Sequence, residues 1–275
     1  MTIVFGWPEA CSRTGDTWPG GGGGLVKAMD NAIYVGLSRQ MLLLRELDIV
    51  ANNLANVDTV GFKFEDLLAG ADPQAPASGG GGASSPVVFV AGDGVARDYS
   101  QGPLTQTGSP LDLAIDGRGF FQISTASGPR YTRDGRFRLD ATGRIVTQDG
   151  DAVEGTGGDI VIDPKKGPVA IAASGDVSQS GQVVGKVAVV TFDSLAALSK
   201  DGNNQYRNDS NLTASPATGA QLRQGMLETS NVQPVVQITH LIEISRAYDA
   251  ISSMINDTAN LSNTAVQRLG AVTAT

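Results

Sequence analysis

The organisation of this chain is decided by residues 51–63, which read Ala51-Asn52-Asn53-Leu54-Ala55-Asn56-Val57-Asp58-Thr59-Val60-Gly61-Phe62-Lys63. Asparagine side chains offer the backbone local hydrogen-bond partners and tolerate left-handed conformations. Gly61 adds conformational freedom just beyond them. Because a helical pattern precedes this stretch, we expect a helix to end here in a defined turn rather than to fray.

The preceding helix is expected over residues 29–54, with Asp30 capping its start through its carboxylate. Seven positions at alternating spacings of four and three form a heptad seam, in which only Gln40 is polar. The same stripe is also compatible with an amphipathic helix that packs on its own domain. The seam positions are Ile33, Leu37, Gln40, Leu44, Leu47, Ala51 and Leu54.

A second helix is expected from about Asn231 to Leu269. Ser230 and Asn231 are suitable caps, and Pro234 falls in the first turn, where its missing N–H is not needed. Its seam is apolar at first and then changes to small and polar residues. We therefore expect two coiled-coil-like helices, one near each end of the chain, that pair with each other. The second seam consists of Leu241, Ile244, Tyr248, Ile251, Ile255, Thr258, Ser262, Ala265 and Leu269.

Short apolar runs separated by turn residues fill the middle of the chain. Asp-Gly pairs at 116–117, 134–135 and 149–150 predict tight turns, since glycine supplies the positive φ that such turns need. The expected fold is α+β, with an all-β domain, sandwich or barrel-like, inserted between the helices. The expected parts are an atypical, disordered extension (1–28), the first helix and its turn (29–63), a Gly/Pro-rich linker (64–97), the β domain (98–198), a connector (199–229) and the second helix (230–275).

Composition argues against several classes of function. The net charge of −8, from 20 basic and 28 acidic residues, disfavours nucleic acid or an anionic membrane surface as the main partner. No run is long and apolar enough to span a bilayer, and residues 1–28 lack the pattern of a usual signal peptide. Cys11 and His240 are single, so neither a disulfide within the chain nor a His/Cys zinc site is expected. We found no nucleophile motif or phosphate loop, and expect no cofactor.

Three blocks of the sequence resemble the bacterial flagellar rod and hook family. The first combines residues 29–40 with the asparagine-rich stretch 51–63, and it is the most specific. The second covers 109–121 and 131–137, and the third covers 228–232 and 245–248. The opening and the modest length are most similar to proximal-rod proteins, while distal-rod and hook-type proteins are the alternative. The resemblance implies a structural subunit of the basal-body rod, exported unfolded by the flagellar type III apparatus, with itself and other rod subunits as partners.

On this interpretation, the terminal helices of many subunits pack together and the β domain decorates the outside, because a lone subunit covers its seams only in part. A rival interpretation is a secreted β-domain binding module whose helices only oligomerise it, and another is an enzyme with an unfamiliar site. The expected assembly interface consists of Ile33, Leu37, Leu44, Leu47, Leu54, Asn52, Asn53, Asn56, Gly61, Leu241, Ile244, Tyr248, Ile251 and Ile255.

Overall fold

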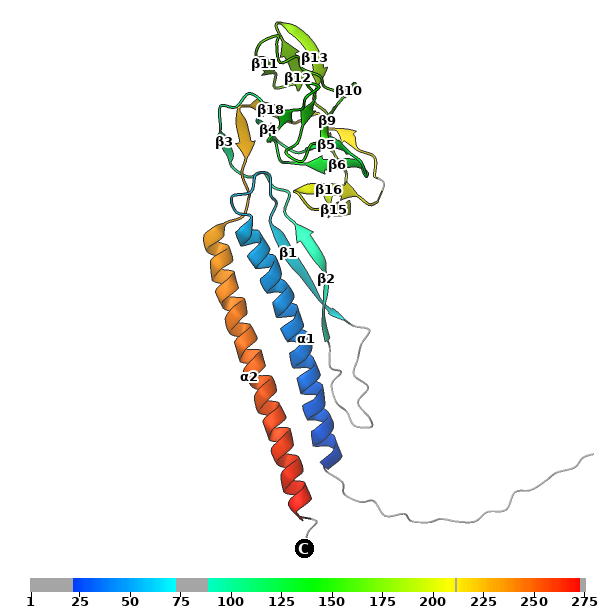
Figure 1. Cartoon of the computed structure of the whole chain (residues 1–275). Coiled ribbons are helices and arrows are strands. Elements are labelled where there is room, and N and C mark those ends of the chain that lie inside the picture. Colours follow the sequence, from blue (N-terminus) through cyan, green and yellow to red (C-terminus); the bar gives the residue numbers. More distant parts are fainter. Residues whose placement is uncertain (1–21, 73–88, 211, 273–275) are drawn as a thin grey trace, which may run out of the picture.

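Two long helices lie side by side and carry a β-rich head at one end (Figure 1). The computed structural model describes residues 22–72, 89–210 and 212–272. Helix α1 runs from Gly22 to Ala55 toward the head, and α2 runs from Pro234 to Val272 away from it. We call these two antiparallel helices the shaft. The expected pair of helices is therefore present, and the two elements far apart in sequence pack along each other.

The two helix starts differ in how well the sequence predicted them. Helix α2 begins at Pro234, as its placement in the first turn predicted. Helix α1 begins at Gly22, so Asp30 lies inside it and does not cap its start. Once a helix is nucleated, each further residue adds a hydrogen bond, which favours continuation even through glycines. Residues 22–28 of the expected extension therefore belong to α1, while residues 1–21 lie outside the described chain.

The contact between the helices only partly follows the predicted seam of α1: Leu47 packs there as predicted, but at other positions the contact falls one residue earlier. Leu43 and Val50 of α1 are buried against Ile244 of α2. Leu44, on the predicted seam, is instead 45% exposed. Helix α1 carries apolar residues at adjacent positions, so spacing alone cannot choose between two seams about 100° apart. Gly36 helps to decide, because a Cβ there would lie only 3.0 Å from Ile255 Cγ1.

A β-hairpin, and not a plain linker, follows the turn after α1. Strand β1 (Glu65–Asp72) pairs antiparallel with β2 (Phe89–Arg97), and the hairpin packs along α1 (Figure 1). Neither strand has the strict alternation of apolar and polar residues that predicts a β-strand, so the sequence did not indicate the hairpin. The two strands are held by pairing with each other and by packing on the helix. The rest of the expected linker, residues 73–88, lies outside the described chain.

The head contains the remaining strands, residues 104–228, and it confirms a β-rich insertion between the helices. Its largest sheet has the order β15-β16-β6-β5-β9-β8-β7, to which β10, β14 and β17 add, and smaller groups are β11-β12-β13, β18-β4 and β19-β3. The strands are β3 (Leu104–Gln106), β4 (Leu113–Asp116), β5 (Phe120–Thr125), β6 (Gly128–Thr132), β7 (Arg138–Leu139), β8 (Ile145–Val146), β9 (Ala152–Gly155), β10 (Gly158–Asp159), β11 (Val169–Ile171), β12 (Asp176–Gln179), β13 (Gln182–Lys186), β14 (Val189–Thr191), β15 (Leu198–Lys200), β16 (Gln205–Asn208), β17 (Ser215–Pro216), β18 (Gln221–Gln224) and β19 (Met226–Glu228), with a short 3-10 helix at Leu195–Ala197.

The expected connector, residues 199–229, is part of the head. Strand β16 pairs with β6, β18 pairs with β4, and β19 pairs with β3. Tyr206 of β16 is buried with Phe120 and Tyr131 in the second of two apolar cores, while the larger core surrounds Phe121 and Ile123. Sequence reasoning assigned this segment to a loop because its strands pair with partners far away in the sequence and its own composition is polar.

The Asp-Gly turns separate into two kinds. Gly117 and Gly150 have φ of +109° and +98°, as predicted for such turns. Gly135 does not have a positive φ. It is glycine because a Cβ there would lie 1.6 Å from the carbonyl oxygen of Leu113, whose own N–H donates to Gly135 O at 3.0 Å.

Replacing Gly135 by alanine should therefore lower the free energy of unfolding by about 1–3 kcal/mol, the usual cost of overpacking. The measurement is urea-induced unfolding followed by circular dichroism. Gly157→Ala is the matched control, because nothing lies within 4 Å of a Cβ at that position. Equal stability of the two variants would contradict the close-approach explanation.

Candidate functional site: the joint between shaft and head

The asparagine turn joins α1 to the hairpin and to α2. Asn53 is fully buried. Its side chain donates to the Glu65 carbonyl at 2.7 Å and accepts from the Glu65 N–H at 3.0 Å. The same amide nitrogen lies 3.5 Å from Gln237 Oε1 on α2. Asn56 donates to the Asn52 carbonyl at 2.8 Å, so the asparagines build the turn as the sequence predicted.

A buried cluster of charges lies just beyond this turn. Glu228, at the end of β19, is 1% exposed. One of its carboxylate oxygens lies 2.5 Å from Lys63 Nζ, and the other lies 2.9 Å from Arg133 Nη1. Lys63 also donates to the Ser100 carbonyl at 2.6 Å, and Arg133 Nη2 to the Gly117 carbonyl at 2.8 Å. We call Lys63, Arg133 and Glu228 the charge cluster.

The charge cluster ties together the three blocks that the sequence singled out. Lys63 closes the asparagine-rich stretch, Arg133 belongs to the block in the head, and Glu228 opens the block that precedes α2. Burial lowers the pKa of Lys63, and the adjacent Glu228 carboxylate opposes that effect. A buried charge is tolerated only when it is paired and hydrogen-bonded. The three side chains therefore depend on one another, and the cluster fixes the head on the shaft.

Backbone contacts make the same joint close-fitting. The Gly61 N–H donates to the Glu228 carbonyl at 2.7 Å. Gly61 has φ of +69°, and a Cβ there would lie 2.5 Å from the carbonyl carbon of Arg133. Asn231 accepts from the Phe64 N–H at 2.7 Å and donates to the Asp98 carbonyl at 2.9 Å. Asn231 thus crosslinks the segments on either side of the hairpin instead of capping α2.

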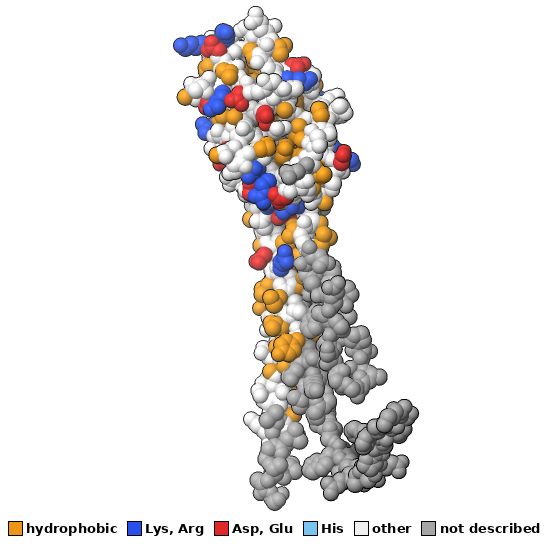
Figure 2. Space-filling model, turned by 90° about the vertical axis from the view of Figure 1, so that its right-hand side faces the viewer, with side chains coloured by type: hydrophobic (Ala, Val, Ile, Leu, Met, Phe, Trp, Pro, Cys, Tyr) orange, Lys and Arg blue, Asp and Glu red, His pale blue; other side chains and the backbone are white. Residues whose placement is uncertain are grey.

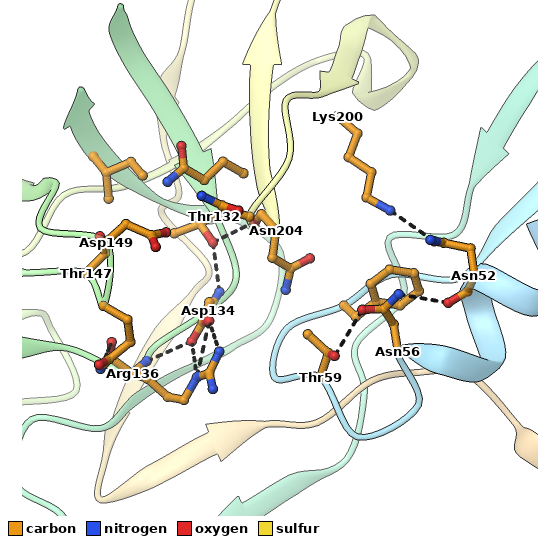
Figure 3. Close-up of a pocket in the computed structure, with 15 residues that line it drawn as sticks. Asn52, Asn56, Thr59, Thr132, Asp134, Arg136, Thr147, Asp149, Lys200 and Asn204 are labelled. Atoms are coloured by element: carbon orange, nitrogen blue, oxygen red, sulfur yellow. Dashed lines mark hydrogen bonds and ion pairs between the residues drawn. The ribbon is translucent and has the colours of Figure 1, made fainter. Parts of the chain in front are cut away.

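A polar crevice of about 420 Å³ separates the asparagine turn from the head. Figure 3 shows Asn52, Asn56 and Thr59 on one side, with Asp134 and Arg136 on the other. Asp134 is engaged by Arg136 at 2.6 Å, so its carboxylate is already paired. No group of three His, Cys, Asp or Glu side chains that could hold a metal ion occurs in the part of the chain that the structure describes. The crevice is therefore a polar surface at the joint between shaft and head.

The predicted interface residues fall into three groups in the structure. Those that face the other helix of the same chain are Leu47, Leu241, Ile244, Tyr248, Ile251 and Ile255. The second group belongs to the turn, where Asn53 and Gly61 are buried, Asn56 is half-buried and Asn52 is exposed. The third group lies on the shaft with side chains partly or largely open to solvent: Ile33, Leu37, Leu44 and Leu54.

The shaft also exposes large apolar side chains that sequence reasoning did not select. On α1 these are Tyr34 and Met41, which extend the exposed stripe of Leu37 and Leu44. Figure 2 shows hydrophobic side chains along the shaft below the head. Contiguous exposed apolar surface is a common feature of interaction sites in proteins. The additional exposed residues on α2 are Val235, Val236, Ile238, Ile242, Met254 and Leu261.

Lys63, Arg133 and Glu228 were also not selected as site residues. Each of them lies inside one of the three blocks that resemble the family. The presence of one charged residue of this kind in each block was the signal that could have pointed to them. Their convergence depends on the pairing of β19 with β3 and on the path of the chain after the turn. Neither follows from local sequence patterns.

A shaft of two paired helices with exposed apolar side chains, joined firmly to a β-rich head, is an architecture suited to packing against other subunits. Three family models match the chain: the flagellar basal-body rod protein model at residues 33–63, the flagellar hook protein FlgE/F/G D1 domain at 114–179, and the flagellar basal-body rod FlgEFG protein C-terminal model at 223–268. The chain belongs to the flagellar basal-body rod protein family, as a structural subunit of the bacterial flagellum basal body.

Named relatives support this assignment over nearly the whole chain. The flagellar basal-body rod protein FlgF of Caulobacter vibrioides is 54% identical over 245 residues, which cover 89% of this chain and 100% of the relative. The FlgF of Mesorhizobium japonicum is 36% identical over 251 residues, covering 88% and 99%. The rod protein FlgG of Bacillus subtilis is 36% identical over 250 residues, covering 82% and 94%.

Proposed function

We propose that this subunit takes a place in the proximal rod, where it assembles with copies of itself and with other rod subunits through its terminal helices and transmits torque mechanically. The observation that carries the proposal is the exposed apolar surface of the shaft, where Leu37 is 47% and Met41 is 65% exposed. Burial of such surface is worth about 25 cal/mol per Å², so contacts on several sides favour assembly. The likeness to FlgF relatives supports the proximal position, with a distal-rod or hook-type role as the alternative.

The proposal requires no catalysis and no cofactor, because torque passes through shape and packing. We also propose export through the flagellar type III apparatus, in agreement with family membership. No helix in the described ranges is long and apolar enough to cross a membrane, and the proposed role needs none to do so. The head then lies on the outside of the rod, since the apolar stripes belong to the shaft.

Deletion of the gene for this chain in its own bacterium tests the function directly. We expect cells without hooks or filaments, in which rod assembly stops early and motility is lost. A tagged full-length chain should restore motility and co-purify with basal bodies. Complete rods in the deletion strain, or a complementing chain found outside basal bodies, would contradict a role as a rod subunit.

The free subunit should be ordered mainly in its head. Among the described residues, the apolar cluster between the helices has three buried members, Leu43, Val50 and Ile244, while the head holds two larger apolar cores. We therefore expect the shaft to open far more often than the head. Limited proteolysis of the purified monomer should leave a fragment near residues 98–229, which is longer than the expected β domain because the connector strands pair into the head. Loss of this region with intact helices would contradict the expectation.

A further inference from the structure

The two helices leave bare apolar residues on opposite sides of the shaft. On α1 we call Tyr34, Leu37, Met41 and Leu44 the band. Two of them directly follow residues that contact α2: Leu37 follows Gly36, and Leu44 follows Leu43. Tyr34 and Met41 lie three residues before Leu37 and Leu44, on the same face of the helix. On α2 we call Met254 and Leu261, with Ala250 a turn before them, the ridge. Met254 precedes by one residue Ile255, which packs at Gly36.

The helical repeat decides which side each set occupies. One residue corresponds to about 100° of rotation. In an antiparallel pair, the residues one position after the contact residues lie on the same side of the pair in both helices. The residues one position before the contact residues lie on the other side in both helices. The band is one step forward on α1 and the ridge is one step back on α2. They therefore lie on opposite sides of the shaft.

Band and ridge also match in height and length. Met254 Cε lies 3.5 Å from where a Cβ on Gly36 would be, so Met254 is level with Gly36. Ala250 lies one turn nearer the head, so the ridge begins level with the middle of the band. At about 1.5 Å per residue, the band spans about 15 Å and the ridge about 16 Å. Ala250 offers a small side chain that permits close approach of a neighbouring helix.

The hairpin distinguishes the two sides of α1. Leu42, one step back from Leu43, is 5% exposed, while Leu44, one step forward, is 45% exposed. The hairpin packs along α1, and we assign it to the side of Leu42, since that side is covered. The side that carries the band is left open to a neighbour.

We propose that the band of one copy of this chain packs against the ridge of a second copy that stands beside it with its head at the same end. The inference rests on the proposed function and names its contact surfaces. Because band and ridge are different surfaces on opposite sides, the contact is heterologous and each copy keeps one of each free, so that further copies can add. The axial shift between neighbours is small, on the order of 10 Å or less from the helix rise.

Disulfide trapping in assembled basal bodies tests this contact. Cys11 is replaced by serine, and Leu37→Cys is combined in turn with Ala250→Cys, Met254→Cys and Leu261→Cys. Opposite sides of one shaft cannot join within a chain, so oxidation should convert most of the monomer into dimers and a ladder of higher bands for at least one pair. Each single-cysteine chain should give no band above a dimer.

The control is Gly36→Cys with Ile255→Cys, two positions that meet between the helices of one chain, because a Cβ on Gly36 would lie only 3.0 Å from Ile255 Cγ1. This pair should close within one chain and shift the monomer band without a ladder. Ladders absent from all three test pairs, in basal bodies that contain the chain, would overturn the band-to-ridge contact and indicate another rod protein as the neighbour. Absence of the chain from basal bodies would instead overturn the proposed function.

Discussion

Replacing Glu228 by alanine should lower the free energy of unfolding by about 3–5 kcal/mol, the cost of breaking a buried ion pair from one side. Lys63 and Arg133 would then be left buried without their shared carboxylate, and the Gly102 N–H, which donates to Glu228 Oε1 at 2.9 Å, would lose its acceptor. The transition is measured by urea unfolding of the full-length chain. Since the cluster joins shaft to head, we also expect the proteolytic fragment of the head to become less resistant.

Two comparison variants make the Glu228 result specific. Asp116→Ala removes an exposed ion pair with Arg223, of 3.0 Å, which should cost only about 0–1 kcal/mol. Replacing Lys63, Arg133 and Glu228 together by methionine removes all three buried charges and should recover much of the stability, because an apolar substitute leaves no charge unpaired. If Glu228→Ala were no more harmful than Asp116→Ala, the charge cluster would not hold the joint.

The main architecture could be predicted from the sequence because the spacing of apolar residues that defines each helix repeats over short distances. The heptad spacing around Leu47 and Ile244 and the proline at 234 are short-range signals, and both helices are present, although α1 begins earlier than predicted. The choice of seam on α1 failed because Leu43 and Leu44 are both apolar and only the partner helix decides between them. Gly36 carried the deciding information, since it marks where α2 approaches closely.

The joint could be predicted only in part. The asparagine turn followed from the backbone preferences of Asn53 and Asn56, which are local. The charge cluster did not follow, because Lys63 and Glu228 are 165 positions apart and meet only through pairing in the head. The segment 199–229 was misassigned for the same reason: strands such as β18 are stabilised by partners distant in sequence, which a window of neighbouring residues does not contain.

Aspartate at both Leu37 and Leu44 should abolish motility while leaving the folded monomer intact. Both side chains are nearly half exposed in the single chain, so substitution there should change the free energy of unfolding by no more than about 0.5 kcal/mol each. In an assembled rod the same positions would be covered, and an unpaired carboxylate buried between helices costs several kcal/mol. Assembly should therefore fail although folding does not.

The matched control adds two aspartates at exposed alanines of the head, Ala126 and Ala173, which gives the same change in net charge. Motility in soft agar and the amount of chain in purified basal bodies are measured for both variants, together with urea unfolding. The band variant should be absent from basal bodies with an unchanged unfolding midpoint, and the head variant should assemble normally. Normal motility of the band variant would mean that Leu37 and Leu44 stay solvated in the rod, and the shaft would then have to join its neighbours through other residues. A loss of stability together with motility would place these two leucines in the fold of the single chain instead of in its assembly.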